Sequence, residues 1–260
     1  MRGAKTSAQP WLLLMLATFS FAQSPPPQPA TTPGGENSLA QQAADPTAPL
    51  MAFNLKEEYS PSFYGAPGSN SDFLFQPVIP FVAWGVPNLL RATVNYNTSG
   101  FAGTGLNNIS IFDLIVFNEK WGRWGFGPLV QFVPNSGSGR DTALAGPALG
   151  FVARKGKWNL GVFNQNLFGA NTRFSSLQPI IAYVLGKGWT LASGDAQWSI
   201  DWTRPGWVYI PIGVQLAKVV KLGRQPVRFS VNPEYNARNI SGAPHWTVRF
   251  GMTILVPMKK

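Results

Sequence analysis

Arg228, Glu234 and Arg249 are ionisable residues in two neighbouring, strand-like and otherwise apolar stretches near the end of the chain. Guanidinium and carboxylate groups that face water inside a pore can set its charge selectivity. The same groups on adjacent strands can instead form a cross-strand ion-pair network that fills and stiffens a narrow barrel. Both interpretations stay open here. We favour the network because about 12 strands enclose only a narrow interior.

Further polar residues occupy comparable positions in other apolar stretches. If the apolar face of each strand meets lipid, the opposite face lines the interior, because side chains alternate between faces. The predicted lining residues are Gln76, Arg91, Asp113, Gln131, Gln178, Asp195, Gln215, Arg228, Asn232, Glu234 and Arg249, together with Lys56 and Glu58. Cations and acids balance in this set, so strong ion selectivity does not follow from it.

Catalytic chemistry is the third possibility. His245 is the only histidine, and the sequence places no obvious serine or aspartate partner beside it. A hydrolytic triad needs a base within hydrogen-bond reach of its nucleophile. No zinc-protease, lipase-type serine, phosphate-loop or dinucleotide-binding motif occurs in a suitable context. We therefore expect no enzyme, no catalytic residue, no metal and no cofactor. A lipid-acting barrel enzyme is the less favoured alternative.

The elements that position these residues are amphipathic strands. In the stretch 245–257, Trp246, Val248, Phe250, Met252, Ile254 and Val256 share one face, and small or polar residues share the other. A strand of about 10 such residues crosses a bilayer when it is tilted. This pattern recurs along most of the chain and predicts an all-β fold, a closed antiparallel transmembrane β-barrel.

Turn-rich breaks separate about 12 strand candidates, an even number as in bacterial barrels. They span approximately 50–59, 72–83, 88–97, 108–118, 121–134, 143–154, 157–167, 173–185, 188–201, 206–218, 226–237 and 244–257. The connections alternate between short and long. Bacterial barrels have short periplasmic turns and long outer loops, which predicts that both termini are periplasmic.

Composition agrees with a barrel of this kind. Charged residues make up 12% of the chain, against about 25% in soluble domains, and aromatic residues 13%. The sequence contains no stretch of 18 or more consecutive apolar residues, the length that would predict a membrane-spanning helix. The prolines within the predicted strands do not fit a barrel as well, because proline has no N–H with which to donate a hydrogen bond to the neighbouring strand. They mark either bulges or misplaced strands: Pro77, Pro80, Pro128, Pro147, Pro179, Pro211 and Pro233.

The N-terminus has the parts of a secretory signal. Arg2 and Lys5 precede a short apolar stretch, and Ser20-Phe21-Ala22 resembles a cleavage site. We expect a cleaved signal peptide at 1–22, a flexible Pro/Ala/Gln-rich periplasmic leader at 23–49, with a short helix around Leu39–Ala44 as an option, and the barrel at 50–260.

Tryptophan and basic residues cluster at predicted strand ends. Tryptophan prefers the boundary between hydrocarbon and headgroups. The predicted girdle comprises Trp84, Trp121, Trp124, Trp158, Trp189, Trp202, Trp207 and Trp246. The basic residues at the periplasmic ends are Lys120, Arg123, Arg154, Lys155, Lys157, Lys187, Lys218, Lys221, Arg224, Lys259 and Lys260. They predict a solvated rim or contact with anionic headgroups. Outer-membrane lipids are thus expected partners, and nucleic acid is not.

Several stretches resemble a known family. LQPIIAYVLGKGW (177–189), IPIGVQLAKVVKLGRQPVRF (210–229) and WTVRFGMTILVP (246–257) are similar to bacterial outer-membrane proteins that are assigned to transport. FQPVIP (75–80) and GPALGFVARKGKWNLGVFNQN (146–166) resemble them too. The family carries the label "meta-pathway of phenol degradation", and its members are sometimes misnamed neuromedin U. The resemblance implies an outer-membrane barrel but brings no site residues.

Together these patterns predict a porin-like channel of the bacterial outer membrane for passive passage of small solutes. The alternative is a closed structural or adhesive barrel that binds a partner through its outer loops. The sequence indicates neither the solute nor the oligomeric state.

Overall fold

A computed structural model describes residues 35–100, 103–134, 141–169, 171–204 and 206–256. The expected signal peptide, the leader up to residue 34 and the basic end 257–260 lie outside these ranges. Among the described residues, no helix has the length and apolar character needed to cross a membrane.

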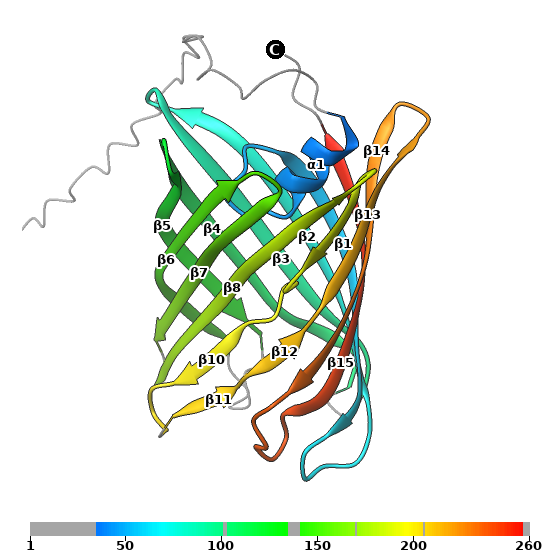
Figure 1. Cartoon of the computed structure of the whole chain (residues 1–260). Helices are drawn as coiled ribbons and strands as arrows, with labels where there is room; N and C mark the ends of the chain where they lie inside the picture. The colour runs from blue at the N-terminus through cyan, green and yellow to red at the C-terminus, as the bar shows by residue number, and fades with distance from the viewer. Residues whose placement is uncertain (1–34, 101–102, 135–140, 170, 205, 257–260) are drawn as a thin grey trace, which may run out of the picture.

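The described residues form a closed antiparallel β-barrel preceded by a short helix (Figure 1). Its elements are α1 (Glu36–Ala43), β1 (Met51–Phe63), β2 (Asn70–Ala83), β3 (Val86–Gly100), β4 (Gly105–Glu119), β5 (Gly122–Val133), β6 (Thr142–Lys155), β7 (Trp158–Gly169), β8 (Thr172–Gly186), β9 (Trp189–Ala192), β10 (Trp198–Asp201), β11 (Trp207–Tyr209), β12 (Pro211–Gly213), β13 (Gln215–Leu222), β14 (Gln225–Asn236) and β15 (Pro244–Val256).

The 15 strands form 12 spans of the barrel, because two of the spans are interrupted. β9 and β10 form one broken span, and β11, β12 and β13 form another. β1 pairs with both β2 and β15, and β9 pairs with both β8 and β13, which closes the ring. The predicted number and order of strands are confirmed. The interruptions, at 193–197, at Ile210 and at Val214, were not predicted.

One end of the barrel carries tight turns. The connections 84–85, 120–121, 156–157, 187–188 and 223–224 each have two residues. Trp84-Gly85 and Lys187-Gly188 have positive φ at both positions, the backbone that matches the twist of a two-residue hairpin. We call this the short-turn end. Longer connections join most strands at the opposite, long-loop end, although β7 and β8 are separated by only 170–171. α1 and the last residues of β15 also lie at the short-turn end (Figure 1).

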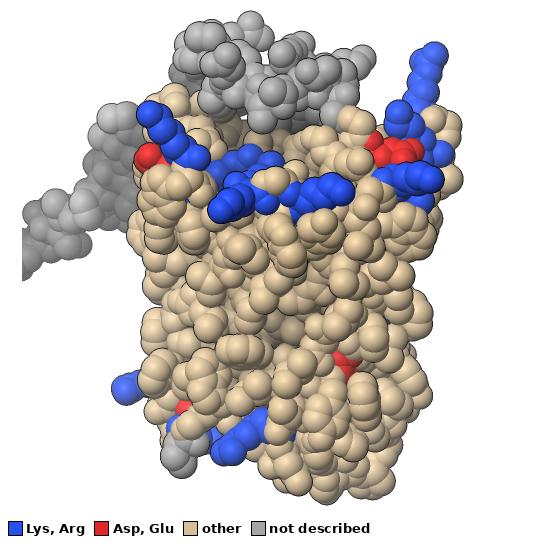
Figure 2. Space-filling view, in the orientation of Figure 1, with Lys and Arg blue, Asp and Glu red and all other residues tan. Residues whose placement is uncertain are grey.

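Alternation along the strands separates an apolar exterior from a filled interior. In β15, Phe250 is 55% exposed whereas Thr247, Thr253 and Leu255 are buried. Lys and Arg gather at the short-turn end, and the middle of the visible exterior has little charge (Figure 2). The interior differs from one side to the other. Strands β3–β8 contribute an apolar cluster that includes Leu114, Leu129 and Phe163, and the polar groups lie mainly across from it.

Three mid-strand prolines coincide with local gaps in the ladder. Register pairs are missing beside Pro77 in β2–β3, beside Pro128 in β4–β5 and beside Pro147 in β6–β7, yet the register before and after each gap is the same. The strands are therefore placed as predicted and lose hydrogen bonds only locally. Pro211 differs, because it begins β12 within the broken tenth span.

Phe250→Arg tests the assignment of the exterior face to lipid. Phe250 lies in the middle of β15, and an arginine facing lipid near the bilayer midplane costs about 2–4 kcal/mol of folding free energy. We expect a loss of that size in unfolding titrations in lipid vesicles. Trp84→Arg, in a turn at the short-turn end and 94% exposed, is the control and should change stability by less than about 1 kcal/mol. Equal effects would contradict a lipid-facing Phe250.

Candidate functional site

The N-terminal segment 36–50 packs into the mouth at the short-turn end. Leu39, Ala40, Ala48 and Leu50 are buried in a cluster with interior residues of β1, β13 and β15, among them Leu255. Polar contacts anchor the helix to the turns: Gly188 N–H donates to Asn37 Oδ1 (2.8 Å), Gln41 Nε2 to the Gly156 carbonyl (3.0 Å) and Asn159 Nδ2 to the Gln41 carbonyl (2.8 Å).

The expected flexible leader is therefore corrected from residue 35 onward. This part is folded against the barrel wall, because its apolar side chains are buried there. The predicted helix is present as Glu36–Ala43. We refer to residues 36–50 as the plug.

Asp45 holds the plug to two arginines on the neighbouring strands β5 and β6. Its carboxylate, 1% exposed, lies 2.9 Å from Arg123 Nη1 and 2.8 Å from Arg154 Nη2. Its other oxygen accepts hydrogen bonds from the backbone and hydroxyl of Thr47. Arg123 and Arg154 thus point inward, although the sequence analysis assigned both to the solvated rim. Asp45 is the only charged residue between Glu36 and Lys56, which is the signal that could have identified it.

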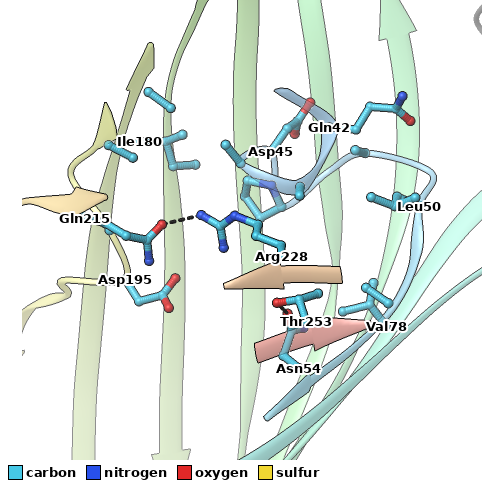
Figure 3. A pocket seen from close by; sticks show the side chains of 18 of the residues that line it. Gln42, Asp45, Leu50, Asn54, Val78, Ile180, Asp195, Gln215, Arg228 and Thr253 are labelled. Atoms are coloured by element: carbon cyan, nitrogen blue, oxygen red, sulfur yellow. Dashed lines mark hydrogen bonds between the residues drawn. The ribbon is translucent and has the colours of Figure 1, made fainter. Parts of the chain in front are cut away.

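Beneath the plug lies a cavity of about 120 Å³ (Figure 3). The plug contributes Asp45, Ala48 and Leu50, and the wall contributes polar and apolar residues from several strands. The polar ones are Asn54, Lys56, Gln76, Arg91, Gln178, Ser193, Asp195, Gln215, Arg228 and Thr253. The arrangement can hold water or a small solute among charged groups within the barrel.

The charges in the cavity do not cancel. Lys56 Nζ lies 2.5 Å from Asp195 Oδ2, and Arg228 donates to Gln215 Oε1. Arg91 stacks on Phe112, with its guanidinium carbon 4.3 Å from the ring centroid. Among the described residues, Asp195 is the only carboxylate that lines the cavity apart from Asp45, whose charge is already shared by two arginines.

The break between β9 and β10 places Asp195. Ser193 Oγ donates to the Pro179 carbonyl, and Gly194 adopts a positive φ of 73° that directs the chain inward. The Asp195 N–H then donates to Asn232 Oδ1 (3.2 Å), and Gln178 Nε2 donates to the Gly194 carbonyl (3.2 Å). Without this interruption, residue 195 would be part of a continuous strand in the barrel wall and would not be directed into the cavity.

Arg249 forms a second charged cluster outside the cavity lining. Its Nε lies 2.6 Å from Glu58 Oε1, and its Nη1 pairs with Glu234, whose side chain is fully buried. These three residues come from adjacent strands, β1, β15 and β14. The cross-strand ion-pair network is present for Arg249, Glu58 and Glu234, whereas Arg228 belongs to the cavity.

Most of the predicted lining residues lie on the interior side. Gln76, Arg91, Gln178, Asp195, Gln215 and Arg228 line the cavity. Asn232, Glu234 and Arg249 are bonded within the barrel, and Gln131 shares the face of buried Leu129.

Asp113 is a correction. It shares its face with the exposed Ile111 and Ile115 and therefore lies on the exterior. The alternation rule fails in β4 because Phe112 and Leu114, on the interior face, are apolar as well. The strand therefore offers no contrast between its two sides.

The tryptophans of the predicted girdle divide between the two ends of the strands. Trp84, Trp121, Trp124, Trp158 and Trp189 lie in or beside the short turns, and Trp202, Trp207 and Trp246 lie near the long-loop end. All except the half-buried Trp207 are exposed.

His245 lies among aromatic rings. Its ring centroid is 4.6 Å from that of Tyr64 and 5.4 Å from that of Tyr235. The Tyr64 hydroxyl donates to that of Tyr235, and this hydrogen bond raises the pKa of Tyr64 to about 12. The Tyr64 phenol is thus neutral around pH 7. In the described part of the chain, the contacts of His245 are with rings and not with a serine hydroxyl.

No family model and no curated protein matches the sequence. Solved structures with a similar fold include outer membrane phospholipase A from Escherichia coli, with a TM-score of 0.44 and 11% identity over 84% of this chain and 97% of that chain. The calcium-bound phospholipase dimer from Salmonella typhi has a TM-score of 0.44 and 10% identity over 87% and 99%.

These matches correct one expectation. The sequence analysis expected no enzyme because the chain has a single histidine and no recognisable catalytic motif. That expectation is corrected, because the solved structures with a similar fold are enzymes. At this identity and TM-score the likeness assigns neither an activity nor site residues to this chain.

Proposed function

We propose that this outer-membrane β-barrel is a channel for small solutes, closed in this conformation by the plug at its periplasmic mouth. The observation that carries the proposal is the polar cavity inside the barrel, directly beneath a segment that is held by side-chain contacts and not by the β-ladder. A segment of that kind can leave its site without breaking the barrel. The short-turn end faces the periplasm in this proposal, as in bacterial barrels generally.

Passage would be passive, through weak contacts with the interior polar groups. The resemblance to outer-membrane proteins assigned to transport agrees with this proposal. The apolar cluster of β3–β8 narrows the interior on one side, so the solutes would follow the polar side formed by β14, β15 and β1.

Conductance in planar lipid bilayers tests the proposal. We expect small, steady currents from the full chain and currents at least about 100-fold larger from a variant that lacks residues 36–49, because about 3 kcal/mol of plug contacts corresponds to a factor of about 100. Removing the plug opens the mouth but leaves β1 intact. Correct folding of both proteins is checked by heat-modifiable migration in gels. Absence of current from both folded proteins would contradict a channel.

A further inference from the structure

We propose that the cavity beneath the plug binds a small carboxylate with an apolar body, with Arg91 and Arg228 as the groups that recognise the anion. Both arginines line the cavity, from β3 and β14 respectively. A planar guanidinium offers paired N–H donors that match the two oxygens of a carboxylate.

Both guanidiniums hold donors that the protein leaves unused. Arg228 is 8% exposed, and its Nε has no hydrogen-bond acceptor among the described residues. The same holds for Nε of Arg91. Buried polar groups in proteins almost always have partners, and unpaired buried charges are costly. An anion in the cavity would satisfy these donors.

The positive charge of the cavity is only partly balanced. Asp195 pairs directly with Lys56 and interacts with Arg91 and Arg228 electrostatically. One carboxylate therefore faces three cations, since Asp45 is occupied by Arg123 and Arg154. A monoanion would reduce this excess from two positive charges to one, whereas a cation would be repelled.

The rest of the lining indicates an apolar body on the anion. Leu50, Val78, Ile180 and Leu255 line the cavity together with several alanines. Arg228 and Asp195 lie in the same cavity as Leu50, Val78 and Ile180 (Figure 3). A small ligand with a charged head and a hydrocarbon body would contact both kinds of surface and displace water from the apolar one.

Binding at this site does not require transport. We also infer that such carboxylates are the solutes that cross the membrane through the barrel, and this additional inference rests on the proposed function. Equilibrium binding in detergent micelles tests the site, and bilayer currents test the channel. Either can fail while the other holds.

The experiment measures binding of butanoate to the folded full chain by isothermal titration calorimetry, with butanamide as the uncharged analogue. We expect butanoate to bind at least about tenfold more tightly than butanamide, because a hydrogen bond to a charged group is worth about 1.5–3 kcal/mol. Arg228→Gln and Arg91→Gln should each weaken butanoate by about tenfold or more. Arg204→Gln is the matched control, since Arg204 is 69% exposed at the long-loop end, and should have no effect.

Asp195→Asn separates the proposal from simple misfolding, because it should tighten butanoate binding by about tenfold as the competing carboxylate is removed. Inorganic phosphate should compete only weakly, since it has no apolar body. Unchanged or weaker binding in Asp195→Asn, equal affinity for butanamide, or binding of phosphate without butanoate would each overturn the proposal.

Discussion

Asp45→Asn should raise the bilayer conductance of the protein by about 100-fold. The carboxylate of Asp45 is buried and accepts charge-assisted hydrogen bonds from Arg123 and Arg154. Breaking a buried ion pair by removing one partner costs about 3–5 kcal/mol. A loss of about 3 kcal/mol from the docked plug multiplies the open fraction by about 100, since each 1.4 kcal/mol is a factor of ten.

The matched control is Glu119→Gln, which removes the same charge from an exposed residue at the same end of the barrel. Its conductance should equal that of the wild type. If Asp45→Asn also matched the wild type while the folded variant lacking 36–49 conducted strongly, then the apolar contacts of Leu39 and Leu50 alone would hold the plug. The role of the ion pairs would be wrong.

Arg249→Met should lower the free energy of unfolding by about 3–5 kcal/mol. The substitution keeps an unbranched side chain but leaves Glu58 and the fully buried Glu234 without their shared cation. Two carboxylates in a closed interior then repel each other with no cation between them. Urea-induced unfolding in lipid vesicles measures the change.

Two further variants identify the cause of that loss. Arg204→Met breaks an ion pair in which Arg204 is 69% exposed and should cost less than about 1 kcal/mol. Combining Arg249→Met with Glu58→Gln and Glu234→Gln removes the uncompensated charges and should recover most of the stability. If the combined variant were as unstable as Arg249→Met alone, lost packing and not charge would be the cause.

The barrel could be predicted from the sequence because the patterns that indicate it depend only on residues that are close together in the chain. Strict alternation in 245–257, two-residue turns such as Lys187-Gly188 and scarce charge each report the environment of a residue without reference to distant parts of the chain. The same rule placed Arg228 and Arg249 on the interior. It failed at Asp113, where both faces of the strand are apolar and the period carries no information.

The site itself depended on contacts that no local pattern shows. Asp45 meets Arg123 and Arg154 across more than 70 positions of chain, and the composition of the leader indicated a segment with little to bury. The inward turn at Gly194 and Asp195 was hidden because the sequence on either side still reads as strand. Polar residues within the strands were thus predictable, but not the plug that closes the cavity over some of them.

A disulfide that ties the plug to the wall tests most directly whether solute passage requires the plug to move. The chain has no cysteine, and a β-carbon placed at Gly125 would lie 3.6 Å from Cγ2 of Thr47 in the plug. In the variant Thr47→Cys/Gly125→Cys, bilayer current should fall to the baseline when the pair is oxidised and return on addition of reductant. Current that is the same in the oxidised and reduced states would contradict the account, because solutes would then pass with the plug in place.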